Sequence, residues 1–140
     1  MGKSHVEILL IEDNPDDAEL IFRIFKKNKS AEYLVHVTNG EEALKYLSSD
    51  ISKLPKLIIA DLNMPLVNGF EFLKKVKSDE STKIIPVVVL TSSQEENDIM
   101  KAYSLGVNAF IVKPIDYTEF SEVINQIIRF WLHFNQSPMY

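Results

Sequence analysis

Short apolar runs alternate along this chain with longer stretches in which apolar residues recur every three or four positions. The runs cover residues 6–11, 33–37, 57–60, 87–90 and 109–112. The last three are almost continuously apolar, which is typical of parallel strands covered on both faces. The second run is the least regular. The pattern predicts five strands with a helical stretch after each.

Residues suited to helix ends stand between these runs. They are Asn14 before Pro15, Asn39, Gly69, Ser93 with Glu96, Gly106, and Asp116 with Glu119. Asn, Ser and Asp can cap a helix N-terminus, and a Glu three residues later completes a capping box. A glycine after the last helical residue ends a helix. The sequence thus predicts an α/β fold of five βα units, a doubly wound parallel sheet with helices on both faces.

The polar residues that follow the predicted strands indicate where a site lies. Glu12 and Asp13 follow the first strand, Asp61 the third, Thr91 the fourth and Lys113 the fifth. Ligands of doubly wound sheets bind outside the carboxyl ends of the strands, near the point where the strand order reverses. We therefore expect these residues, which are far apart in the sequence, to meet on one rim.

This set of residue types suits phosphoryl transfer. Carboxylates on one rim repel each other unless a cation neutralises them, and oxygen ligands with room for water suit Mg²⁺. The metal and Lys113 would balance the charge on the phosphoryl oxygens, and Thr91 would supply a hydroxyl donor. Asp61 would attack in line, and a carboxylate needs no general base.

Each residue taken alone also has a purely structural explanation. A strand-end aspartate such as Asp61 is usually a turn residue or a helix cap. Thr91 alone could be an ordinary strand residue, and Lys113-Pro114 an ordinary turn. Phe110 lies within a predicted strand and is expected in the core. Only the complete set, with these types in this order, favours a phosphoryl-transfer site.

On these motifs the chain resembles the receiver domains of two-component response regulators. The matching pieces are Glu12-Asp13, Asp61 in IIADLNMP, Gly69, Thr91 in VVVLTSS and Lys113 in AFIVKP. The resemblance runs from about residue 6 to residue 132. It implies the flavodoxin-like fold of chemotaxis regulators, with strand order 2-1-3-4-5.

The resemblance also implies roles for individual residues of the acidic site. Asp61 would be the phosphoacceptor, which takes its phosphoryl group from a histidine kinase. Asp13 and Asp61 would bind Mg²⁺ directly, with Mn²⁺ as a possible substitute. Glu12 would bind the metal through water, and the backbone carbonyl of Asn63 would be a third protein ligand.

The remaining implied roles concern the response to phosphorylation. Lys113 would contact the phosphoryl group. Thr91 would move toward it, and Phe110 would be the switch aromatic. The Lys113–Pro114 peptide bond would be cis, as is usual in this family.

A narrower resemblance concerns the C-terminal half. The stretch SDESTKIIPVVVLTSSQEENDIMKAYSLGVNAFIVKP, with INQIIRFWL further on, is similar to stand-alone regulators that pair with phytochrome-type histidine kinases. The general resemblance implies a sensor histidine kinase as partner, and the narrower one implies a kinase of the phytochrome type.

The last predicted helix, residues 117–134, is longer than the sheet needs. Its apolar stripe consists of Phe120, Val123, Ile124, Ile127, Ile128, Trp131 and Leu132. Its 18 residues would span about 27 Å, whereas a strand of five or six residues spans only about 17–20 Å. The overhang bears Phe130, Trp131 and Phe134. It predicts either a two-fold homodimer through this helix or a fold-back of Trp131 and Phe134 onto the domain's own edge.

Composition narrows the classes of protein. The 140 residues fit a single domain over 1–140 with its core at 6–134, and only six residues follow Phe134, so we expect no effector domain and output through a protein surface. A net charge of −5 argues against a DNA partner, and the absence of cysteine excludes disulfide and thiol chemistry. The N-terminal apolar run is too short for a signal peptide or a membrane span, so we expect a cytoplasmic protein with no membrane partner.

Other functions compete with this interpretation. A haloacid-dehalogenase-like phosphatase also uses a strand-end aspartate and Mg²⁺, but it needs an acid where this chain has Asn63. A flavodoxin-like cofactor binder needs a phosphate cradle rich in Ser, Thr and Gly where this chain has EDNPDD. A receiver-fold scaffold that works without phosphorylation stays open. We expect no enzyme activity beyond self-catalysed phosphorylation and dephosphorylation, and no phosphorelay role for His5, His36 or His133.

Overall fold

The computed structural model describes residues 8–49, 54–64 and 67–138. Five parallel strands form one sheet in the order β2-β1-β3-β4-β5, as the resemblance implied. The strands are β1 (Ile8–Ile11), β2 (Leu34–Val37), β3 (Leu57–Ala60), β4 (Val87–Thr91) and β5 (Ala109–Val112). Each predicted run is therefore a strand, and residues 6 and 7 of the first run lie outside the described residues.

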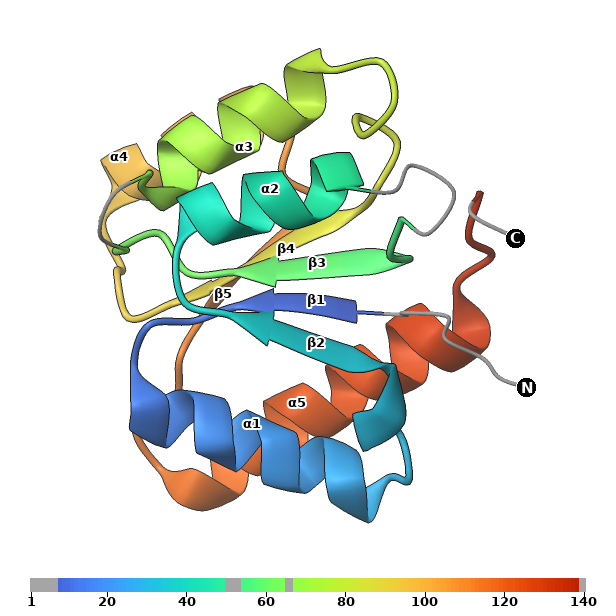
Figure 1. The fold of residues 1–140 in the computed structure, drawn as a ribbon. Helices are drawn as coiled ribbons and strands as arrows, with labels where there is room; N and C mark the ends of the chain where they lie inside the picture. The colour runs from blue at the N-terminus through green and yellow to red at the C-terminus, as the bar shows by residue number, and fades with distance from the viewer. Residues whose placement is uncertain (1–7, 50–53, 65–66, 139–140) are drawn as a thin grey trace, which may run out of the picture.

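Helices cover both faces of the sheet. They are α1 (Pro15–Lys27), α2 (Gly40–Ser49), α3 (Gly69–Ser78), α4 (Glu96–Ser104) and α5 (Tyr117–Ile128), with a short 3-10 helix, η1 (Ala31–Tyr33), before β2. Figure 1 shows α1 and α5 on one face and α2, α3 and α4 on the other. This arrangement confirms the predicted doubly wound (βα)5 fold.

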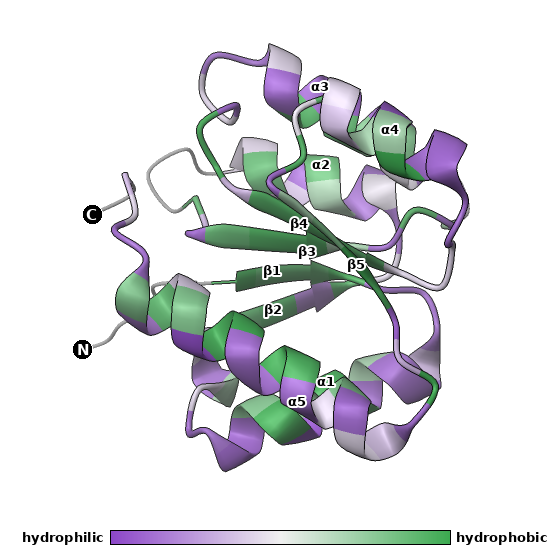
Figure 2. Cartoon of the chain, turned by 180° about the vertical axis from the view of Figure 1, so that it is seen from behind, coloured by the Kyte–Doolittle hydropathy of each residue, from purple (hydrophilic) through white to green (hydrophobic). Residues whose placement is uncertain are grey.

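The core has two layers because successive strand residues point to opposite faces of the sheet. Leu9 and Ile11 pack with Phe72 of α3 in the layer beneath α2, α3 and α4. Ile8 and Leu10 pack with Phe25 of α1 in the layer beneath α1 and α5. Figure 2 shows β1, β3, β4 and β5 as largely hydrophobic and β2 as partly hydrophilic, whereas the helices alternate between hydrophobic and hydrophilic residues. Two-sided burial fixes the sheet, and with it the positions of the strand ends.

The strand predicted at 109–112 is covered on both faces, with Phe110 against one core layer and Ala109 and Ile111 against the other, but less completely than β3 and β4. All four residues of β5 are only partly buried, whereas every residue of β3 and β4 is buried. β5 lies at one edge of the sheet, next to β4 alone, and solvent reaches it from the side. Phe110, expected in the core, accordingly packs against the core beneath α2, α3 and α4 while remaining partly exposed.

Most of the predicted helix ends are confirmed. The Asn14 side chain accepts hydrogen bonds from the backbone N–H groups of Asp16 and Asp17, and Pro15 occupies the first position of α1. Gly106, with a φ of 103°, follows the C-cap of α4, where a left-handed backbone favours glycine.

Two further predicted caps are also present. The Asn39 side chain accepts from the N–H of Glu42 at 2.8 Å, at the start of α2. The Asp116 side chain accepts from the N–H of Glu119 at the start of α5. Both bonds satisfy backbone donors that the first helical turn leaves without partners.

The predicted capping box of Ser93 with Glu96 is wrong. Helix α4 begins at Glu96 with Glu95 at its N-cap, and no side chain caps it. The Ser93 hydroxyl instead donates to the Asp98 carboxylate at 2.6 Å. The Ser93 oxygen also accepts from the N–H of Glu95 at 3.4 Å, and because the N-cap is Glu95, Ser93 lies two residues too early to cap α4.

The final helix has the predicted bounds but not one geometry throughout. α5 continues directly into a π-helix, η3 (Arg129–Phe134), in which Trp131 and Leu132 pack against the core beneath α1 and α5. Phe130 and Phe134, which lie off the predicted stripe, are 51% and 61% exposed. The fold-back alternative therefore holds in part for Trp131 and fails for Phe134.

The expected cis bond between Lys113 and Pro114 is also absent, because the described residues contain no cis peptide bond. The trans isomer is the more stable form of an X–Pro bond, and the turn after β5 forms with it. None of the helices in the described part of the chain is long and apolar enough to cross a membrane.

Candidate functional site

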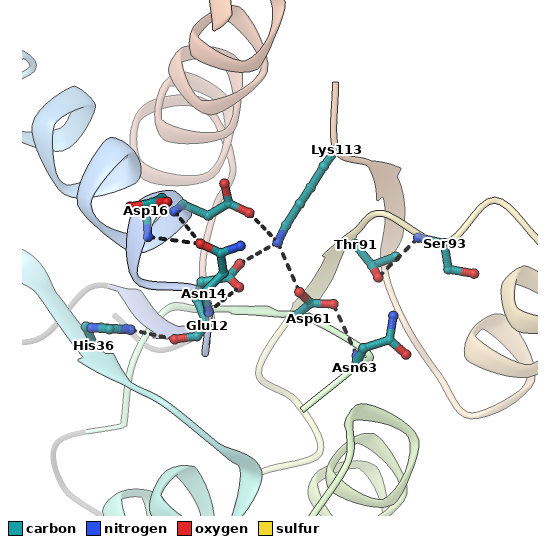
Figure 3. Close-up of polar contacts among 10 residues, drawn as sticks. Glu12, Asn14, Asp16, His36, Asp61, Asn63, Thr91, Ser93 and Lys113 are labelled. Atoms are coloured by element: carbon teal, nitrogen blue, oxygen red, sulfur yellow. Dashed lines mark hydrogen bonds and ion pairs between the residues drawn. The ribbon is translucent and has the colours of Figure 1, made fainter. Parts of the chain in front are cut away.

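The strand ends deliver the predicted residues to one rim (Figure 3). Ile11 and Ala60 are partners in the β1–β3 register, so the residues that follow them, Glu12 and Asp61, leave adjacent strands side by side. The N–H of Asp61 donates to the carbonyl of Ile11 at 3.2 Å, which extends the ladder by one step. The acids therefore stand at the point where the strand order reverses.

Lys113 reaches this point from the end of β5. Its backbone N–H donates to the carbonyl of Thr91 at 2.7 Å, so β4 fixes the start of its side chain. Its Nζ lies 2.8 Å from Oε1 of Glu12, 2.8 Å from Oδ2 of Asp17 and 3.0 Å from Oδ2 of Asp61. One ammonium thus joins three carboxylates from three separate elements.

The predicted metal ligands lie together. Carboxylate oxygens of Glu12, Asp13 and Asp61 all lie within 4.8 Å of one another, with Glu12 and Asp61 buried and Asp13 exposed. Three hard oxygen donors with one side open to water match the preference of Mg²⁺ for carboxylates and retained water. The chemistry of the donors fits the metal that the sequence predicts.

The loop after Asp61 is held tightly against the start of α3. The N–H of Asn63 donates to Oδ1 of Asp61 at 3.2 Å, and the N–H of Gly69 donates to the carbonyl of Leu62 at 3.0 Å. A Cβ atom at position 69 would lie 2.6 Å from the Asp61 carbonyl oxygen and 2.6 Å from the Leu62 Cα. Only glycine at position 69 allows the backbone of α3 to come this close to the backbone of Asp61 and Leu62. Asn63, whose carbonyl is the predicted metal ligand, follows directly in the same loop.

Burial dominates the electrostatics of Glu12. Only 1% of its side chain is exposed, and this burial raises the pKa of Glu12 from 4.5 to about 7. The hydrogen bond and charge of Lys113 lower that pKa, while the charge of Asp61 raises it further. Oε2 of Glu12 also accepts from the N–H of Asn14 at 3.1 Å.

The neighbouring acids hold Lys113 in its charged form. Burial alone would lower the pKa of the Lys113 ammonium, but hydrogen bonds to Asp17 and Glu12 and the charges of Glu12 and Asp61 outweigh that effect. The pKa of Lys113 therefore lies above its ordinary value. The site keeps a permanent cation beside Asp61 at any physiological pH.

The predicted switch residues lie on the α4 side of this rim. Thr91 is fully buried, and its Oγ1 accepts from the N–H of Ser93 at 3.4 Å. Phe110 pairs in register with Val89, two residues before Thr91, and packs into the core on that face. The two side chains therefore belong to neighbouring strands and share one layer.

Sequence reasoning missed two residues that belong to the site. Asp17 binds Lys113, and its place one helical turn after Asp13 was the available signal, because helical side chains lean toward the N-terminus of their helix. His36, at the edge strand β2, donates from Nε2 to the backbone carbonyl of Glu12 at 2.8 Å. No motif in the sequence pointed to His36, since only the strand order brings β2 beside β1.

Comparison with known proteins identifies the family of this chain. The model of the response regulator receiver domain matches residues 8–125. The chain belongs to this family. Its acidic pocket of Glu12, Asp13 and Asp61 is the acidic pocket of a receiver domain.

Individual relatives cover nearly the whole receiver domain. The probable methanogenesis regulatory protein FilR2 of Methanothrix harundinacea (strain 6Ac) is 37% identical over 134 residues, which span 94% of this chain and 86% of that protein. Response regulator Rcp1 of Synechocystis sp. (strain ATCC 27184 / PCC 6803 / Kazusa) is 34% identical over 129 residues, 89% of this chain and 88% of that protein.

Two solved structures are close in fold. The phosphorylated cyanobacterial phytochrome response regulator RcpA has a TM-score of 0.88 and 36% identity, covering 96% of this chain and 99% of that one. The Mn²⁺-bound form of Rcp1 has a TM-score of 0.87 and 32% identity, covering 95% of this chain and 99% of that one. The narrower similarity to phytochrome response regulators is thus confirmed.

The burial of Glu12 predicts a pH dependence of stability in the metal-free protein. Because the pKa of Glu12 is raised in the folded state, from 4.5 to about 7, the folded protein binds more protons than the unfolded chain between these values. The free energy of unfolding should therefore fall as the pH rises across this window, by up to roughly 3 kcal/mol. Urea denaturation in EDTA at several pH values measures it.

The variant Glu12→Gln, which is neutral at every pH, should lose this part of the slope. Glu41→Gln, at an exposed position in the first turn of α2, is the matched control and should retain the wild-type slope. A Glu12→Gln variant with an unchanged slope would contradict the account of Glu12.

Proposed function

We propose that Asp61 accepts a phosphoryl group from a histidine kinase and that the receiver domain changes a protein-interaction surface in response. The observation that supports this is that both oxygens of the Asp61 carboxylate accept hydrogen bonds, Oδ2 from the Lys113 ammonium and Oδ1 from the N–H of Asn63. The carboxylate is thereby oriented as a nucleophile at the mouth of an acidic pocket.

The transfer balances without any further reactant. A carboxylate oxygen of Asp61 forms a bond to phosphorus, while the bond from phosphorus to the histidine nitrogen breaks and the electron pair stays on nitrogen. Charge develops on the equatorial phosphoryl oxygens in the transition state, and the Lys113 ammonium lies within reach to stabilise it. In hydrolysis a water oxygen forms the bond to phosphorus, the bond to Asp61 breaks with its electron pair staying on the carboxylate, and inorganic phosphate leaves while the water's proton passes to solvent.

Mg²⁺ belongs to this proposal, with Mn²⁺ as a substitute. Asp13, Asp61 and the carbonyl of Asn63 would hold the ion directly, and Glu12 would hold it through water. The metal would neutralise the charge of the acids and of the incoming phosphoryl oxygens. Support comes from the carboxylate cluster and from the relative Rcp1, whose structure has a Mn²⁺-bound form.

Phosphorylation of Asp61 is directly testable. Incubation with Mg²⁺ and acetyl phosphate should add the mass of one phosphoryl group to the intact protein, and Asp61→Asn should add none, because its side chain is no longer a nucleophile. Asp79→Asn, at an exposed loop position after α3, is the control and should be labelled like the wild type. Mass spectrometry of the intact chain and its peptides reads the result.

Equal labelling of Asp61→Asn and the wild type would contradict the role of Asp61. An unlabelled wild type would favour the phosphorylation-independent scaffold. The same pair of proteins tests the partner: an autophosphorylated phytochrome-type kinase should transfer label to the wild type and none to Asp61→Asn. The phytochrome type is proposed because RcpA is a phytochrome response regulator.

The proposed switch couples Thr91 to Phe110. Drawing the Thr91 hydroxyl toward a phosphoryl group would open space in the layer that Phe110 shares, and the ring would move inward. Beryllofluoride with Mg²⁺ should therefore shift the Phe110 ring resonances in NMR spectra, and Thr91→Ala should suppress that shift. The ring of Phe120, buried on the opposite face, is an internal reference. A Phe110 shift of wild-type size in Thr91→Ala would contradict the coupling.

We further propose a homodimer through the last helix. Phe130 and Trp131 form an edge-to-face pair with ring centroids 5.0 Å apart, and Phe130 and Phe134 are exposed. Figure 2 shows the hydrophobic colouring continuing along the last helix toward the C-terminus. A second copy related by a two-fold axis would cover these rings with its own.

The dimer is measured by sedimentation at tens of micromolar protein. The wild type should sediment as a dimer, and the double variant Phe130→Ser with Phe134→Ser should be monomeric because the covering rings are lost. Phe22→Ser, which changes an exposed phenylalanine of α1, should stay dimeric. A monomeric wild type would contradict the proposal.

A further inference from the structure

Carboxylates surround the Lys113 ammonium, which donates hydrogen bonds to Asp17 and Asp61 and forms an ion pair with Glu12. It has three N–H bonds, and three carboxylate oxygens lie at 2.8, 2.8 and 3.0 Å from Nζ, on Glu12, Asp17 and Asp61. Figure 3 shows the Lys113 side chain extended toward Glu12 and Asp61. A phosphoryl oxygen can therefore gain a hydrogen bond from Lys113 only by displacing one of these partners.

The three partners differ in how readily they release the lysine. The side chains of Glu12 and Asp61 are 1% and 8% exposed, so without Lys113 each would be a buried acid with little access to water. The side chain of Asp17 is 28% exposed. Water can replace the ammonium at Asp17. Of the three acids, Asp17 therefore loses its hydrogen bond to Lys113 at the lowest cost in free energy.

The position of Asp17 is fixed by the start of α1. Its N–H donates to Oδ1 of Asn14 at 3.1 Å, and it lies in the first helical turn. An anion there is favoured by the backbone N–H groups and the helix dipole. These interactions persist when Lys113 leaves, which lowers the free energy of releasing it further.

We propose that Asp17 is a positioning residue that holds Lys113 in the unphosphorylated site and competes with the phosphoryl group for it. The proposal rests on the phosphoacceptor role of Asp61. Transfer to Asp61 and hydrolysis both place charge on the equatorial oxygens, so both need the donor that Asp17 occupies. Asp17 therefore slows both reactions and sets how fast the domain responds.

The competition is tested first without any phosphoryl chemistry. In Asp17→Asn the Lys113 Nζ resonance, observed by ¹H–¹⁵N NMR of the ammonium groups, should move because a charged partner has become a neutral one. Asp16→Asn is the matched control: it makes the same charge change in the same helical turn, and the three ion pairs of Lys113 do not include Asp16. The control should leave the resonance in place.

The kinetic test uses the same variants with acetyl phosphate and Mg²⁺. Asp17→Asn should raise both the phosphorylation rate constant and the hydrolysis rate constant by about two- to fivefold, the range expected for losing a partly exposed ion pair. Asp16→Asn should match the wild type in both. In a Lys113→Gln background the Asp17→Asn change should have no effect on either rate constant, because the ammonium for which Asp17 and the phosphoryl group compete is absent.

Each other outcome has a distinct meaning. An unmoved Lys113 resonance, or a resonance that moves while the rates stay equal or fall, would overturn the competition. Acceleration that persists in the Lys113→Gln background would overturn it too, because Asp17 would then act by charge alone. A wild type that takes no phosphoryl group on Asp61 would refute the phosphoacceptor role and the competition together, and it is recognised in the wild type before any Asp17 variant is compared.

Discussion

The burial of acids beside one ammonium is the constraint on which the rest of the structure depends. Removing an ion from water carries an effective penalty of several kcal/mol, and Glu12 and Asp61 are both almost without solvent. Lys113 offsets this penalty only while it stays within hydrogen-bond distance of both. That requirement fixes the position of the end of β5 relative to the ends of β1 and β3, with strand β4 between them.

The constraint explains why the sheet is the most regular part of the molecule. The rim is precise only if β1, β3 and β4 keep their register, and these strands are buried on both faces. The edge strands β2 and β5 have partly exposed residues, yet each brings one side chain to the site. His36 of β2 contacts the carbonyl of Glu12, and Lys113, directly after β5, contacts the three acids. The buried central strands thus position the acids. The edges of the sheet supply His36 and Lys113, whose side chains extend to the acids from partly exposed positions.

Much of this could be predicted from the sequence, for identifiable reasons. Apolar runs gave the strands because two-sided burial leaves a continuous signature, and strand-end residues such as Asp61 followed from parallel topology. Ser93 misled because the pattern of a cap does not show that the N-cap lies two residues later, at Glu95. The partial exposure of β5 depends on the strand order, which hydrophobicity alone does not contain. Asp17 was missed because it follows no strand, and only the fold shows that the Lys113 side chain reaches the first turn of α1.

The close packing at Gly69 has a mechanical consequence. The start of α3 touches the backbone of Asp61 and Leu62 without an intervening side chain, so these two residues and the end of the helix form one tightly packed unit. On the other side of the pocket, Thr91 and Phe110 lie on the neighbouring strands β4 and β5, and their side chains can change rotamer without moving the backbone. A displacement that began at Asp61 would therefore meet less resistance toward these side chains than toward the start of α3.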